Sequence, residues 1–181
     1  MVKPKVSSDS PWCCVTVTMA TLTVLLLVSV VSALVDADKH KCPKKWFGFE
    51  SKCFLIDKTS RTWRDAEHNC VSLGEILESE HQSNSYSGHL ASVHSPEEFQ
   101  YLQALTQAVR LPLWIGGSAR AGQWSWVDGS KFNYKNWAKG KPENFDPERK
   151  SCIQMNYGEK QRWNDETCVK KFPSLCSLRT E

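Results

Sequence analysis

Several sequence patterns are missing from this chain, and each absence argues against a class of function. No C-x-x-C pair follows residue 14, so the later cysteines do not indicate a zinc site. No lysine-arginine run resembles a nucleic-acid-binding arm, and the formal charge of +3 is too small to indicate a nucleic-acid partner. The sequence also lacks a GxSxG nucleophile motif and any convincing pair of catalytic acids. We therefore do not expect an enzyme.

The composition indicates one small secreted domain. The chain has 181 residues, which fits one domain and a targeting segment, and it contains no internal repeat. No N-x-S/T sequon occurs, so N-glycosylation is not expected. Eight tryptophans and eight cysteines are the unusual numbers. Such small domains are commonly secreted, because oxidised cysteines supplement a limited core.

The N-terminus resembles a leader. Lys3 and Lys5 precede an uncharged stretch that runs from Cys13 to Val35. A compact signal peptide could also begin at Met19, and small residues offer cleavage sites at its end, after Ala33 or Ala37. We predict a signal peptide over residues 1–37 and a mature domain over residues 38–181. The alternative is a type II membrane anchor, since the stretch is long enough for a membrane helix.

Cleavage of this leader would leave an even number of cysteines. Of the eight, Cys13 and Cys14 lie in the leader, and six remain: Cys42, Cys53, Cys70, Cys152, Cys168 and Cys176. An even set in an oxidising compartment predicts three disulfides, although the pattern leaves the connectivity open. No thiol is left over for a covalent dimer.

The first half of the mature chain predicts a hairpin and two helices. The stretch 42–56 alternates aromatic and polar residues around a turn at Gly48. A helix is expected from the cap Thr62 to its end at Gly74, and a second one over 95–109, where Ser95 caps and Glu98 completes a capping box. The polar stretch 75–88 is either an exposed loop or an extension of the first helix.

Short aromatic strands follow the second helix. They are separated by glycine-containing turns and read "LWIGGS", "GQWSWVDGS", "SCIQMNY", "RWNDETC" and "SLCSL". Two early helices with strands on both sides predict an α+β domain whose sheets are mostly antiparallel.

This ordered set of motifs resembles the C-type lectin-like domain, from Cys42 to Cys176. The resemblance rests on "GHLASVHSPEE", "WIGGS", "WSWVDGS", "GKPENF", "WND" and the cysteines. It is closest in character to soluble fish mucus and serum lectins of the lactose-binding type and to type II antifreeze proteins. The resemblance implies the bridges Cys42–Cys53, Cys70–Cys176 and Cys152–Cys168.

The resemblance also implies where a calcium-dependent member would bind its ion. In such members an E-P-N or Q-P-D triplet, an acid two residues before a cysteine, and the Asn-Asp of "WND" hold Ca²⁺, which prefers about 6–8 oxygen ligands. Here the triplet is Lys141-Pro142-Glu143, and Lys150 stands where the acid is expected. Only Asn164 and Asp165 match fully. Two ammonium groups would repel the ion, so we expect no calcium and no other cofactor.

The same substitutions suggest a site that works without metal. Lys141 and Lys150 could neutralise Glu143 and Asp165, leaving hydrogen-bond donors and acceptors on one rim. The expected carbohydrate-binding residues are Lys141, Glu143, Lys150, Asn164, Asp165 and Trp137, with Phe145, Tyr157 and Trp163 flanking them. Galactose-type sugars suit such a rim, because their apolar face stacks on aromatic rings.

Simpler interpretations exist for the same residues. The charged loop 141–150 could be solvated without binding a ligand. Trp163 could belong to the core, and Asn164 and Asp165 could hydrogen-bond turn backbone, as these residue types often do. A zinc site at His89 and His94, which flank a predicted strand, has no matching acid or cysteine cluster.

We therefore expect a secreted lectin that binds galactose-containing glycans on microbial or cell surfaces and agglutinates microbes in mucus or plasma as innate defence. Agglutination needs at least two sites, so a noncovalent homo-oligomer is implied. One alternative is a type II antifreeze-like ice-binding protein, although those relatives carry extra cysteines that this chain lacks. The other is a membrane-anchored, protein-binding receptor of the same fold.

Overall fold

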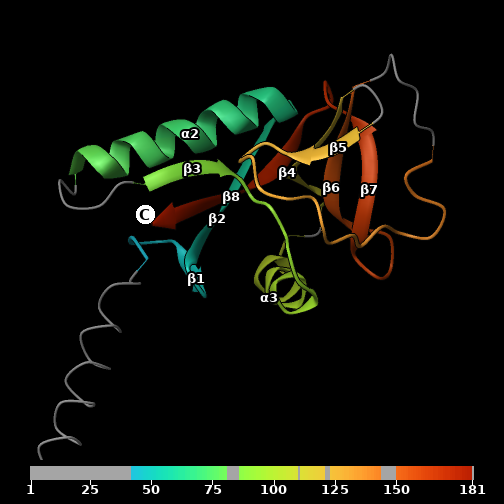
Figure 1. The fold of residues 1–181 in the computed structure, drawn as a ribbon, viewed down its shortest axis with the longest axis horizontal. Helices are drawn as coiled ribbons and strands as arrows, with labels where there is room; N and C mark the ends of the chain where they lie inside the picture. The colour runs from blue at the N-terminus through green and yellow to red at the C-terminus, as the bar shows by residue number, and fades with distance from the viewer. Residues whose placement is uncertain (1–41, 81–85, 110, 121–122, 144–149, 181) are drawn as a thin grey trace, which may run out of the picture. The chain divides into compact units, whose positions relative to one another are not determined.

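The computed structural model describes residues 42–80, 86–109, 111–120, 123–143 and 150–180. The chain divides into two compact units, Met1–Lys41 and Cys42–Glu181, and all of these residues belong to the second. The predicted leader and Phe145 lie outside the described residues. The elements follow in the order β1 (Phe47–Phe49), β2 (Lys52–Arg61), α2 (Trp63–Glu80), β3 (Tyr86–Leu90), α3 (Pro96–Thr106), β4 (Leu113–Arg120), β5 (Gln123–Trp126), β6 (Ser151–Tyr157), β7 (Arg162–Thr167) and β8 (Phe172–Thr180) (Figure 1).

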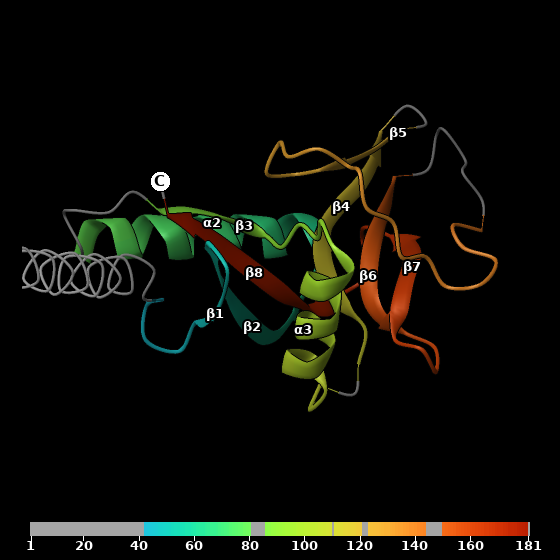
Figure 2. The same ribbon diagram turned by 60° about the horizontal axis from the view of Figure 1, so that its bottom comes forward.

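The strands within the described ranges form one sheet in the order β1-β2-β8-β4-β6-β7, with β3 added to β8 and β5 to β4. Every pairing between named strands is antiparallel except that of β4 with β8, which is parallel at Trp114 and Ser174. The strands β5, β6 and β7 gather at the end of the domain opposite β1 (Figure 1, Figure 2). The prediction of an α+β domain with mostly antiparallel pairing is confirmed.

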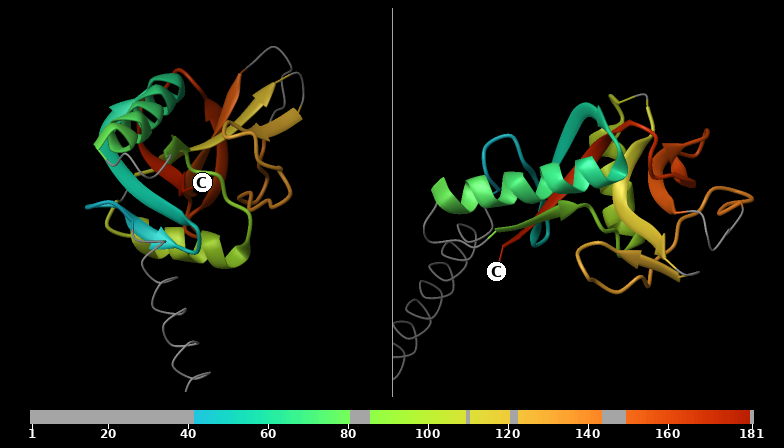
Figure 3. Two further views of the ribbon diagram at one scale, coloured as in Figure 1. Left: turned by 60° about the vertical axis from the view of Figure 1, so that its left-hand side comes forward. Right: turned by 90° about the horizontal axis from the view of Figure 1, so that it is seen from above.

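The two helices cover opposite faces of the central strands, and side-chain alternation along β4 and β8 explains why. Trp114 and Cys176 pack with Ala66 and Cys70 of α2. Their neighbours Ile115 and Leu175 belong instead to the larger cluster that contains Phe99 and Leu102 of α3. Consecutive residues thus face different helices, and α2 and α3 lie on either side of β8 (Figure 3).

The N-cap residues that the sequence predicts for the two helices are confirmed. Thr62 Oγ1 accepts a hydrogen bond from the backbone N–H of Asp65 at 3.2 Å, as an N-cap does. Ser95 Oγ accepts from Glu98 N at 3.0 Å, and Pro96 occupies the first helical position. The carboxylate of Glu98, however, accepts from the N–H of His94 and not of Ser95, so the expected capping box is shifted by one residue.

The predicted end of the first helix is wrong. The helix does not end at Gly74 but continues to Glu80, so the alternative that the following stretch extends the first helix is confirmed as far as residue 80. Gly74 is buried where α2 crosses β3, and a Cβ added there would lie 2.7 Å from the amide nitrogen of Gly88. Gly74 is therefore a close-packing residue within the helix and not a stop signal.

The predicted turn of the first hairpin is also displaced. Gly48 lies inside β1, opposite Cys53, and the chain reverses between Phe49 and Lys52. Glu50 there has a φ of 51°, a left-handed conformation at the turn.

The three disulfides join the pairs that the resemblance implied: Cys42–Cys53, Cys70–Cys176 and Cys152–Cys168. The first closes the β1–β2 hairpin region, the second ties α2 to β8, and the third links the start of β6 to the residue after β7. Each bridge therefore fixes a different part of the domain.

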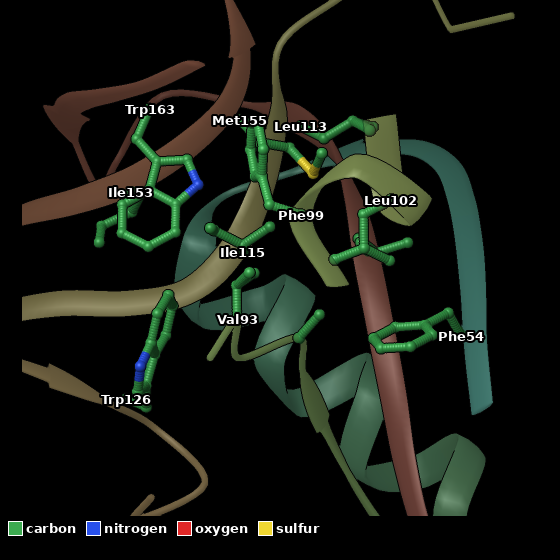
Figure 4. Close-up of a cluster of buried hydrophobic side chains, with 12 residues drawn as sticks. Phe54, Val93, Phe99, Leu102, Leu113, Ile115, Trp126, Ile153, Met155 and Trp163 are labelled. Atoms are coloured by element: carbon green, nitrogen blue, oxygen red, sulfur yellow. The ribbon is translucent and has the colours of Figure 1, made fainter. Parts of the chain in front are cut away.

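The largest core cluster lies between α3 and the strands (Figure 4). Trp163 is 0% exposed there and packs edge-on to Trp126, with ring centroids 5.6 Å apart. The indole of Trp163 is enclosed by core side chains, so the interpretation of Trp163 as a core residue is confirmed and the expectation that it flanks a ligand is wrong. Across the described ranges, no helix is long and apolar enough to cross a bilayer.

Candidate functional site

The segment that precedes the Lys-Pro-Glu triplet is anchored to β7 by main-chain hydrogen bonds. Trp163 N donates to Asn136 O at 2.9 Å, and Ala138 N donates to Trp163 O at 2.8 Å. Lys141 N then donates to Ala138 O at 3.0 Å, which closes a turn. The Lys141–Pro142 peptide bond is cis. The triplet is thus held next to Asn164 and Asp165, although more than twenty residues of chain separate them.

A polar cavity of about 190 Å³ lies between these segments. Its described lining comprises Lys141, Glu143, Ser151, Tyr157, Asn164, Asp165 and Glu166. Four of the six predicted site residues therefore meet around one hollow: the lysine and glutamate of the triplet and the Asn-Asp pair.

Lys141 is the one positively charged side chain in the described lining of this cavity. Its Nζ lies 2.9 Å from Glu143 Oε2 and 5.3 Å from the centre of the Tyr157 ring. The side chain of Lys141 is 9% exposed, whereas that of Glu143 is 66% exposed. The ammonium is thus enclosed between a carboxylate and an aromatic face, and both attract its positive charge.

The Asn-Asp pair supplies oxygen atoms to the same cavity. Asp165 Oδ1 accepts a hydrogen bond from the backbone N–H of Glu143 at 3.0 Å. Asn164 is buried, and its Nδ2 donates to Gln154 Oε1 at 3.0 Å. Asn164 Oδ1 has no hydrogen-bond partner among the described residues. This oxygen is also fully enclosed, so it is not exposed to a ligand in this structure.

The remaining two predicted residues lie elsewhere. The side chain of Lys150 is exposed and is not part of the cavity lining, while its backbone oxygen accepts from Cys168 N. Asp165 is therefore not paired with Lys150 as the sequence suggested, but with the Glu143 amide. Trp137 is half-buried, packs against Trp163 and lines a neighbouring cavity together with Tyr157. The binding roles of Lys150 and Trp137 stay predictions.

The donor set at this cavity does not suit a calcium ion. Glu143, Asn164 and Asp165 offer oxygens of the kind that Ca²⁺ prefers. The ammonium of Lys141, however, is enclosed beside them, and it has donors but no lone pair for a metal. Elsewhere in the described ranges, no group of three or more His, Cys, Asp and Glu side chains could hold a metal.

The two histidines that were considered for zinc belong to separate hydrogen-bonding groups. His89 Nδ1 lies 2.6 Å from Glu67 Oε1, and His94 Nε2 lies 3.0 Å from Ser92 Oγ. The hydrogen bond with Glu67 raises the pKa of His89 above its usual value, although burial opposes the shift.

With the fold and the cavity established, the chain can be compared with known proteins. The profile of the lectin C-type domain matches residues 59–178. The chain belongs to the C-type lectin domain family. The family is not an enzymatic one, in agreement with the prediction that the chain is not an enzyme.

The relatives include sugar-binding lectins and antifreeze proteins. Ladderlectin of Oncorhynchus mykiss is 41% identical over 143 residues, which cover 76% of this chain and 67% of the relative. Lactose-binding lectin l-2 of Anguilla japonica is 34% identical, covering 89% of this chain and 92% of the relative. The crystal structure of a calcium-independent type II antifreeze protein has a TM-score of 0.64 and 36% identity, covering 78% of this chain and 96% of that one. The predicted resemblance to both groups is confirmed.

Two residues of the cavity lining were not anticipated, Ser151 and Glu166. Glu166 directly follows Asn164 and Asp165 on β7, and all three border the cavity although strand alternation alone would place Asp165 on the other face. Strand alternation was therefore not a sufficient signal for Glu166. Ser151 directly follows Lys150, and only knowledge of where β6 begins could have shown that the serine lines the cavity and the lysine does not.

Proposed function

We propose that this lectin-family protein is a secreted carbohydrate-binding lectin that recognises galactose-type glycans at the Lys141 cavity without calcium. One observation carries the proposal: the Lys141 ammonium, 9% exposed, is held between Glu143 and the Tyr157 ring in the hollow that Asn164 and Asp165 also line. A fixed ammonium supplies donors where a metal-dependent lectin would use its ion.

The cavity offers complementary groups for a sugar. Lys141 has three N–H donors, of which the Glu143 ion pair uses one, so sugar oxygens can accept from the others. The carboxylate of Asp165 can accept from sugar hydroxyls. Tyr157, with 38% of its surface exposed, offers a ring edge or face for the apolar side of a galactose unit.

The choice of galactose rests on the relatives, because the Lys-Pro-Glu triplet matches neither family sugar triplet. The lactose-binding lectin l-2 of Anguilla japonica, 34% identical, is named for a galactose-containing disaccharide. Secretion, a noncovalent homo-oligomer and agglutination of microbes in mucus or plasma complete the proposal, since cross-linking of cells requires more than one site per particle.

Retention on a lactose column, in buffers that contain either calcium or EDTA, tests the proposal. We expect equal retention in both buffers and elution by free lactose. Loss of retention upon chelation would contradict the role of Lys141. Absence of retention on lactose and on a wider set of immobilised glycans would contradict the lectin function itself.

An ice-binding function is the second candidate, because the structure of a calcium-independent type II antifreeze protein is 36% identical to this chain. The charged lining of the Lys141 cavity does not favour it, since a hydrated ion pair does not match a flat ice surface. Thermal hysteresis of a dilute solution separates the two functions. A lectin is expected to show none.

A further inference from the structure

A second cavity adjoins the Lys141 cavity and has the opposite electrostatic character. It measures about 360 Å³, and Tyr157 lines both hollows. Its described lining consists of Trp137, Ala138, Lys139, Tyr157, Gly158, Glu159, Lys160 and Arg162. Two aromatic side chains therefore share one cavity with three cations and one carboxylate.

The three cations are available to a ligand. Lys139, Lys160 and Arg162 are exposed, and within the described ranges none of them forms an ion pair with a carboxylate. By contrast, the lining of the Lys141 cavity carries three carboxylates and one ammonium. The two neighbouring hollows thus select for different charges, since a site with excess unpaired cations attracts anions.

The backbone around this second cavity is fixed by hydrogen bonds. Gln161 N donates to Gly158 O at 3.1 Å, which closes the β6–β7 turn. Gln103 Nε2 of α3 donates to Lys160 O at 3.1 Å and holds that turn against the helix. The main-chain positions of Lys160 and Arg162 are therefore fixed before a ligand binds, which lowers the entropy cost of binding.

We propose that this second cavity binds the acidic unit of a glycan, a sugar that bears a carboxylate or a sulfate group. Arg162 and Lys160 bind the anionic group, and the ring of the acidic sugar packs against Trp137 and Tyr157. The proposal rests on the proposed function, because the neutral galactose-type unit of the same glycan occupies the Lys141 cavity. Tyr157 lies at the junction between the two sugar units.

Matched glycan probes test this inference. Biolayer interferometry in EDTA compares immobilised lactose with 3′-sialyllactose, which adds a carboxylate, and 3′-sulfolactose, which adds a sulfate. We expect both acidic probes to bind about tenfold more tightly than lactose at low salt, with the advantage decreasing as salt rises. Preference for only one acidic probe would identify the source of the anion. Equal affinity for all three probes would overturn the inference and leave the lectin proposal intact.

Paired substitutions localise the effect. Lys160→Gln with Arg162→Gln should remove the advantage of the acidic probes, a loss of about tenfold, and leave lactose binding unchanged. Lys44→Gln with Lys58→Gln removes the same charge from exposed positions outside both cavities and should change neither affinity. An equal loss in both double variants would mean that only net charge matters, which would overturn the assignment to this cavity.

A readout that does not depend on galactose separates failure of the inference from failure of the proposed function. Free N-acetylneuraminic acid and sodium sulfate are titrated in turn into the full mature protein and followed by NMR. We expect saturable shifts of the Trp137 indole N–H and the Arg162 side chain. Such shifts without lactose binding would support the anion cavity and contradict the galactose site. No shift at Trp137 or Arg162 would overturn the inference.

Discussion

Lys141 Nζ lies 2.9 Å from Glu143 Oε2, yet only the lysine is enclosed, with 9% of its side chain exposed against 66% for the glutamate. An ion pair with one highly exposed member contributes little to stability, because solvent screens it. The ion pair therefore gives little stability, and the enclosed ammonium is consistent with the ligand-binding role proposed for Lys141.

Removal of this ammonium should separate binding from stability. We expect Lys141→Met to weaken lactose binding by about tenfold or more, since at least one charge-assisted hydrogen bond is lost, while Tm changes by only a few degrees. Isothermal titration calorimetry and differential scanning fluorimetry measure the two effects. Lys58→Met, at an exposed position of β2, is the matched control. Unchanged lactose affinity in Lys141→Met would contradict the proposed site.

Restoring acids at both substituted positions should restore a requirement for calcium. In the double variant, Lys141→Glu presents a further carboxylate beside Glu143, Asn164 and Asp165, which fits the oxygen preference of Ca²⁺, and Lys150→Glu removes a positive charge next to Ser151 of the lining. We expect calcium binding in the millimolar range or tighter by calorimetry, and glycan binding that EDTA abolishes. Titration of the unsubstituted protein with calcium should give no binding heat. A double variant that binds no calcium would indicate that more than these two charges has changed.

The fold could be predicted where its signals are local. The caps Thr62 and Ser95 act on N–H groups within three residues, so their patterns identify the helix starts. The end of α2 could not be predicted in this way, because the role of Gly74 depends on Gly88 of a separate strand. From the sequence alone, a glycine that ends a helix cannot be distinguished from one that allows close packing within a helix.

The crossing of α2 and β3 leads to a stability prediction with an unusual sign. Alanine normally stabilises an exposed helix position relative to glycine by about 1 kcal/mol. At Gly74 the added methyl group would lie 2.7 Å from backbone nitrogen. We expect Gly74→Ala to lower the free energy of unfolding by about 1–3 kcal/mol in urea titrations. Ser72→Ala, exposed on the same helix, should be neutral or slightly stabilising.

The pair formed by His89 and Glu67 predicts a pH dependence of stability. Its hydrogen bond raises the pKa of His89 in the folded state above 6.5. The stabilising contribution is then fully present below the unfolded pKa and is lost as the pH rises through the folded pKa. The free energy of unfolding from urea titrations should therefore decrease as the pH rises from below 6.5 through the raised folded-state pKa of His89. His89→Gln should flatten this decrease, and an unchanged slope would contradict it.

The site was only partly predictable from the sequence, for a physical reason. The resemblance to calcium-dependent C-type lectins implied that Lys141, Glu143, Asn164 and Asp165 share one site, and the structure finds them around one hollow. The direction of a single side chain depends on where a strand begins, which is why Lys150 was expected in the cavity and Ser151 was not. The basic cavity at Trp137 was missed because Lys139, Lys160 and Arg162 come from two separate segments.

The three disulfides differ in how accessible they are. Cys70 and Cys176 are both fully buried in the core, whereas Cys168 is partly exposed to solvent. Cys168 follows the end of β7, two residues after Glu166, which lines the Lys141 cavity together with Ser151. A dilute thiol should therefore cleave Cys152–Cys168 well before Cys70–Cys176. The β6–β7 region around the Lys141 cavity would then lose its shape while the rest of the domain stays folded. A reducing environment would thereby abolish binding at this cavity without unfolding the protein.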